Sequence, residues 1–88
     1  MAQRIPGMGD GVAQRMADAI RAALPDAAVE VRPAAPGHFE VRVVAESFRG
    51  RSRVQQHQLV YAAIAPLMAG DGAPVHAIDA LHTGVPGA

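Results

Sequence analysis

Cysteine is absent from the chain, which excludes disulfide bonds and metal sites built on the chain's own thiolates. The same absence leaves the redox compartment undetermined. No apolar run approaches the roughly 18 residues that a membrane-spanning helix needs, and residues 1–7 lack the apolar core of a signal peptide. These absences predict a soluble, cytoplasmic protein that does not bind membranes.

Aromatic side chains and excess charge are also scarce. The chain has one tyrosine, two phenylalanines and no tryptophan, and alanine supplies much of its 50% hydrophobic content. One small domain with a modest core is therefore expected. Eight arginines balance eight acidic residues, so no global field attracts nucleic acid or a membrane surface. Neither a nucleophile with a histidine base nor paired carboxylates in a cleft can be assembled, and we expect no enzyme.

The sequence is organised around a unit of strand, basic turn, helix and strand. Residues 38–45 alternate between apolar and charged side chains, which predicts a half-buried strand. A helix is expected to start at Ser52, because Ser52 and Gln55 have the spacing of a capping box. The short apolar segment 75–78 then predicts the last strand.

The first part of the chain adds a helix and a strand. Apolar residues recur every fourth position from Val12 to Leu24, which predicts an amphipathic helix that Asp10 caps. The alternation of residues 29–32 predicts a short strand, and the prolines and glycine of 33–37 predict a turn or loop.

These elements predict an α+β fold in the order αββαβ. A hairpin followed by a right-handed parallel crossover gives a three-stranded mixed sheet with both helices on one face. We expect a flexible leader over 1–9, one domain over 10–83 and a frayed tail over 84–88. The last strand has three alternatives: either of two registers that differ by one residue, or a bulge near Asp79. The predicted core consists of Met16, Ile20, Phe39, Val41, Val43, Leu59, Val60, Ala63 and Ile64.

Three sequence blocks together resemble the BolA family, in particular its short-loop bacterial members. The blocks are His38-Phe39-Glu-Val-Arg-Val-Val, Phe48-x-Gly50-x-Ser52-x-Val54-x-x-His57-x-x-Val60-Tyr61, and Val75-His76-Ala77-Ile78. The resemblance implies a domain similar to class II KH folds and a monothiol glutaredoxin partner with which a [2Fe-2S] cluster is shared. It also implies a role in iron-sulfur cluster trafficking or iron homeostasis. No cluster is expected in the isolated protein, which would be a monomer or a weak homodimer.

Residue by residue, the resemblance implies that His76 is a cluster ligand. The family's second ligand lies in the loop between the first two strands, and His38 is the candidate here. His38 matches the family's Ser-His-Phe position, however, and not the usual ligand position. His57 falls in the family's Arg-His-Arg signature, but glutamines replace both arginines; we expect His57 to belong to the surface for a partner or nucleic acid. The final strand is also one residue longer before His82, and the family's Pro-x-x-Trp tail is missing.

The turn that carries Arg49, Arg51 and Arg53 leaves several interpretations open. It is a solvated face, a phosphate-contacting patch or a surface for an acidic partner. We expect His76 to lie beside this turn, so that ligand and docking surface are adjacent. The alternative function is a KH-like nucleic-acid-binding regulator of transcription, since DNA binding is reported of the family; the resemblance also implies a role in stress response. Binding is expected to be steeply salt-dependent in that case, because only this turn concentrates positive charge. It is also expected to be weak, because stacking aromatics and a Gly-x-x-Gly loop are missing.

Overall fold

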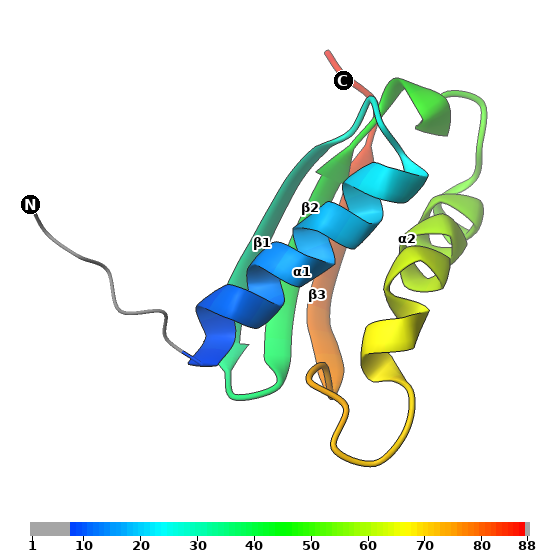
Figure 1. Ribbon diagram of the computed structural model, residues 1–88. Helices are drawn as coiled ribbons and strands as arrows, with labels where there is room; N and C mark the ends of the chain where they lie inside the picture. The colour runs from blue at the N-terminus through cyan, green and yellow to red at the C-terminus, as the bar shows by residue number, and fades with distance from the viewer. Residues whose placement is uncertain (1–7, 88) are drawn as a thin grey trace, which may run out of the picture.

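The computed structural model describes residues 8–87 of the chain. The elements follow the predicted order, and a short 3₁₀ helix, η1, comes after the second strand (Figure 1). Their bounds are α1 Met8–Ala23, β1 Ala28–Ala35, β2 His38–Val44, η1 Glu46–Phe48, α2 Arg53–Met68 and β3 Ala77–Gly84. No helix among these residues is long and apolar enough to cross a membrane.

The sheet has the predicted mixed topology, with β2 in the centre. β1 pairs with β2 in antiparallel orientation, and β3 pairs with β2 in parallel orientation. Both helices lie on the same face of the sheet, α1 against β1 and α2 beside β3 (Figure 1). The predicted α+β fold is confirmed.

Both helix starts had been predicted, and one prediction was wrong. Ser52 is the N-cap of α2, where its Oγ accepts the N–H of Gln55 at 3.1 Å and its own N–H is donated to Gln55 Oε1 at 3.0 Å. The capping box is therefore confirmed. The first helix begins at Met8, so Asp10 lies inside it and not at its N-cap. Glycine in this segment lowers helix stability without blocking the helical conformation, and the helix includes two residues of the predicted leader.

The core contains most of the predicted side chains. Leu59 and Ala63 are only partly buried, because α2 directs Val60 and Ile64 to the sheet and leaves these two at its flanks. The prediction omitted Phe48, which η1 places in the core, and Val75, which precedes β3; they are 0% and 1% exposed. The predicted core residues that are buried are Met16, Ile20, Phe39, Val41, Val43, Val60 and Ile64.

β1 is longer than its sequence pattern suggests. It continues through Pro33, which pairs with Phe39, to Ala35, and the register shifts between Pro33 and Ala35. The prediction of a turn over 33–37 was therefore wrong for its first three residues. Proline is tolerated here because β1 is an edge strand, which has a side that needs no partner. Gly37 closes the turn with a φ of 77°.

β3 contains a bulge at Asp79, one of the alternatives left open by the sequence. Phe39 pairs with Ile78, but the next residue of β2 pairs with Ala80, so Asp79 has no partner of its own. The extra residue changes the parity of the strand. As a result Ile78 and Leu81, three positions apart, both pack against the core. Gly84, predicted to be in the tail, is the last residue of β3.

Candidate functional site

His38 and His76 lie at the same end of the sheet, as the resemblance implies for two ligands. His38 begins β2 opposite Ala77, and His76 immediately precedes β3. The carbonyl oxygen of Gly37 accepts the N–H of His76 at 2.8 Å and the N–H of Ala77 at 3.1 Å. The β1–β2 turn therefore fixes the backbone that carries both histidines. His76 is exposed and His38 is half-buried.

The imidazole of His76 packs directly against Gly37. A Cβ atom on Gly37 would lie 2.5 Å from His76 Nδ1 and 2.7 Å from Cγ, closer than real contacts allow. The positive φ of Gly37 separately disfavours any side chain there. Glycine at 37 is thus required both for the turn and for the position of the His76 ring.

The His38 ring has a carboxylate partner. Its Nδ1 lies 3.0 Å from Oδ1 of Asp79, and the two side chains are 42% and 43% exposed. Asp79 reaches this position as the extra residue of the β3 bulge. We name the group formed by Gly37, His38, His76 and Asp79 the histidine end of the sheet.

The donor set of this end fits a ligand role only in part. Residues 8–87 contain no group of three or more histidine, cysteine, aspartate or glutamate side chains that would hold a metal ion. Two imidazoles cannot complete the ligand shell of an iron-sulfur cluster, which is commonly held by four cysteines. The two imidazoles therefore supply at most part of such a ligand shell.

The arginine-rich turn lies at the opposite end of the sheet, so its predicted position beside His76 was wrong. β2 and β3 run parallel, with His38 opposite Ala77 at one end and Val44 opposite Gly84 at the other. At about 3.3 Å per residue, the length of β2 separates the ends by roughly 20 Å. The turn follows η1 at the far end, whereas His76 precedes β3 at the near end (Figure 1). We name residues 46–52 with Asp26 the turn end.

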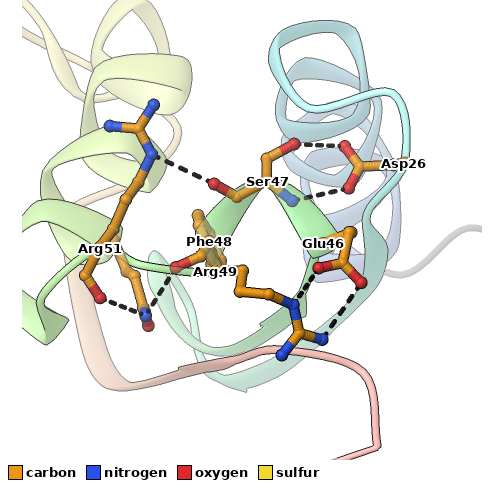
Figure 2. Close-up of polar contacts among 7 residues, drawn as sticks. Asp26, Glu46, Ser47, Phe48, Arg49 and Arg51 are labelled. Atoms are coloured by element: carbon orange, nitrogen blue, oxygen red, sulfur yellow. Dashed lines mark hydrogen bonds and ion pairs between the residues drawn. The ribbon is translucent and has the colours of Figure 1, made fainter.

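Two arginines of the turn end form hydrogen bonds within the turn, one of them to a carboxylate. Arg49 donates from Nε and Nη2 to the carboxylate of Glu46 (Figure 2). This pairing lowers the pKa of Glu46 and raises the pKa of Arg49. Arg51 Nε donates to the carbonyl oxygen of Ser47 at 3.1 Å. Two of the three arginines of the predicted patch therefore have intramolecular partners.

Asp26 ties the loop after α1 to η1, a contact that sequence analysis missed. Its carboxylate accepts the Ser47 hydroxyl at 2.6 Å and the Ser47 N–H at 3.0 Å (Figure 2). These hydrogen bonds lower the pKa of Asp26. The partners are 21 residues apart, and no local sequence signal connects them.

Arg53 and His57 belong to a third location, along the edge between α2 and β3. They line an open pocket with Leu81, His82 and Thr83. His57 therefore lies near His82 and apart from the histidine end. Beside it, Gln56 accepts the Thr83 hydroxyl at 2.7 Å and donates to the carbonyl oxygen of Arg51 at 3.1 Å. One of the glutamines that replace the family's arginines thus connects α2 to its neighbours.

The sheet face opposite the helices carries alternating charges. Arg32 donates to Glu40 at 3.2 Å, and Glu30 lies opposite Arg42 in the β1–β2 ladder. His82 pairs with Arg42 across the β2–β3 ladder. These residues line an open, polar pocket. The mixture of signs does not form a continuous basic surface.

The fold defines an αββαβ domain with a mixed sheet, which solved BolA structures share. The solution structure of mouse BolA1 superposes with a TM-score of 0.71 at 30% identity, covering 98% of this chain and 72% of that one. A BolA homologue from Coxiella burnetii gives 0.68 at 28% identity, with coverages of 83% and 88%.

The model of the BolA-like protein family matches residues 19–86, and the chain belongs to this family. The chain is similar to human BolA-like protein 1, with 46% identity over 48 residues. That match covers 54% of this chain and 33% of the human protein, so it spans about a third of the relative's length. The predicted family resemblance is confirmed.

Proposed function

We propose that the chain is a non-enzymatic adaptor that binds a monothiol glutaredoxin and shares a [2Fe-2S] cluster with it, acting in iron-sulfur cluster trafficking or iron homeostasis. The observation that supports this most strongly is the placement of His38 and His76 together at one end of the sheet, within a BolA-family chain. The partner's identity in this proposal comes from the family resemblance.

The ligand atoms that the chain offers are compatible with a cluster shared between two proteins. The chain has no cysteine, so the ligands it offers are nitrogen or oxygen atoms. Replacing a thiolate ligand by neutral imidazole raises the potential of a [2Fe-2S] cluster. In this proposal His76 is the principal ligand, because Gly37 fixes both its backbone and its ring. His38 is the companion on the neighbouring strand.

The docking surface in this proposal is the histidine end, not the arginine-rich turn. A partner that reached both would have to extend along the whole of β2, since the two ends lie roughly 20 Å apart. The turn between β1 and β2, Pro36-Gly37, precedes His38 directly and packs against the His76 ring, and the loop before β3 ends at His76. These segments are therefore the ones that a glutaredoxin would contact.

The test replaces His76 by alanine and adds a cluster-loaded monothiol glutaredoxin. Because a ligand is lost, the visible absorption and circular dichroism of the mixed complex should change, and its stability should fall. The expected loss is at least the roughly 10–100-fold that removal of a mere supporting group costs a metal site. His57→Ala is the matched control, since His57 lies along the α2–β3 edge. A folded His76→Ala variant with unchanged spectra and affinity contradicts the proposal.

The KH-like regulator gains no support from the charge arrangement. Arg49 is paired with Glu46, and Arg51 is bonded to a backbone carbonyl. The open sheet face mixes both signs. Nucleic-acid affinity depends mainly on basic groups that neutralise phosphates, so we do not propose this function.

A further inference from the structure

The β3 bulge places a carboxylate against a histidine. Without the extra residue, position 79 would pair with Glu40 and continue the regular ladder; with it, the Asp79 carboxylate lies 3.0 Å from His38 Nδ1. The neighbouring carboxylate, that of Glu40, is occupied by Arg32 at 3.2 Å. Asp79 is therefore the carboxylate available to His38 at this end of the sheet.

We infer that Asp79 is a positioning residue for His38, an inference that rests on the proposed function. In neutral imidazole one nitrogen carries the proton and the other has the free lone pair. An Nδ1–H donated to Asp79 leaves Nε2, on the other edge of the ring, as the ligating atom. Metal-bound histidines are commonly held in this way by a carboxylate on the second nitrogen, which fixes both tautomer and ring orientation.

The bulge has two consequences that the tests must separate. It turns Ile78 and Leu81 to the same face, which stabilises the core, and it brings Asp79 to His38. The packing needs an extra residue but not a carboxylate. Asp79→Ala keeps the residue count and removes the acceptor, whereas the isosteric Asp79→Asn keeps the shape and weakens the hydrogen bond. Amide spectra of β2 and β3 report whether the bulge persists.

The first test uses the isolated protein and needs no cluster. Long-range ¹H–¹⁵N spectra distinguish protonated from unprotonated imidazole nitrogens. In the wild-type protein near neutral pH, His38 should show a protonated Nδ1 and an unprotonated Nε2. Asp79→Ala should shift the ring toward the Nε2–H tautomer, and Asp79→Asn should shift it less. Glu40→Ala, which removes the neighbouring carboxylate, should leave His38 unchanged. An Nε2–H tautomer in the wild type, or no response to either Asp79 variant, overturns the inference.

The second test measures the mixed complex with a cluster-loaded monothiol glutaredoxin. Asp79→Ala should weaken it roughly 10-fold to 100-fold, as loss of a supporting group does in other metal sites. The double variant with His38→Ala should be no weaker than His38→Ala alone, because Asp79 acts through His38. A complex that Asp79→Ala leaves unchanged overturns the positioning role while the proposed function stands. If the wild-type protein forms no complex, the proposed function fails and the ligand role of His38 falls with it, whatever the tautomer.

Discussion

The two ends of the sheet are built on different principles. At the turn end, side chains interact with one another: the Ser47 hydroxyl donates a hydrogen bond to Asp26, and Arg49 pairs with Glu46 (Figure 2). At the histidine end, the backbone of Gly37 holds His76. The imidazoles there are left at the surface, one of them with a single carboxylate beside it.

This difference indicates that the turn end stabilises the fold, whereas the histidine end is free to contact a partner. The polar groups of the turn end are engaged within the chain, and Phe48 anchors that end in the core. At the histidine end, a backbone hydrogen bond to Gly37 fixes the position of His76, and the His76 side chain stays exposed. The most arginine-rich segment therefore stabilises the fold, and the less charged end is the better candidate for function.

The largest expected effect tests the structural character of the turn end. Phe48→Ala should lower the free energy of unfolding by about 3–5 kcal/mol, because it removes a fully buried aromatic ring and leaves a cavity. Urea unfolding measures the change. Val54→Ala, at a position that is 66% exposed at the start of α2, is the control and should change stability by about 0.5 kcal/mol or less. Equal effects of the two substitutions would show that η1 is not anchored through Phe48.

A smaller effect should distinguish the turns at the two ends. Gly37 and Gly50 have nearly equal φ values, 77° and 81°, so an alanine at either costs about 1–2 kcal/mol in backbone conformation. Only at Gly37 would the new Cβ also meet the His76 ring. A Cβ atom at Gly50 would meet no other atom within 4 Å. Gly37→Ala should therefore be the more destabilising of the two, and it should also shift the His76 imidazole signals in NMR spectra. Equal stability losses with unmoved His76 signals would refute the contact.

Local patterns predicted the elements well because their causes are local. The alternation of 38–45 follows from one buried sheet face, and the Ser52–Gln55 spacing is itself the cap. The extra residue at Asp79 was detectable as an alternative, since Ile78 and Leu81 cannot share a face in a regular strand. The family blocks then pointed to His76 and His38, which the fold brings to one end.

The prediction that was wrong concerns which distant segments lie side by side in the fold. The parallel crossover itself requires the turn before α2 and His76 to lie at opposite ends, since the helix returns the chain to the start of the sheet. The topology alone therefore excludes the predicted proximity of His76 and the arginines. The contact between Asp26 and Ser47 is different, because it depends on how the loop after α1 meets η1. No spacing rule encodes it.

The smallest expected effect concerns pH and the polar network of the turn end. Hydrogen bonds from Ser47 lower the pKa of Asp26 in the folded protein. They therefore stabilise the folded state at pH values above the ordinary carboxyl pKa, about 3.9. This contribution is lost as the pH falls through the lower pKa of the folded state. Ser47→Ala removes the hydroxyl, the largest of these causes, and should raise the pKa of Asp26 toward its ordinary value. The stability difference between wild type and variant should therefore narrow in acid.

Urea unfolding between about pH 2 and pH 6, with carboxyl ¹³C titration of Asp26, measures this narrowing. Ser52→Ala is the matched control: its hydroxyl accepts the backbone N–H of Gln55, so its loss of about 1 kcal/mol involves no titrating group. That loss should stay constant across the same range. If the two serine variants show the same dependence on pH, then the Asp26 carboxylate does not hold η1, and the contrast between an internally bonded turn end and an open histidine end loses its clearest polar contact.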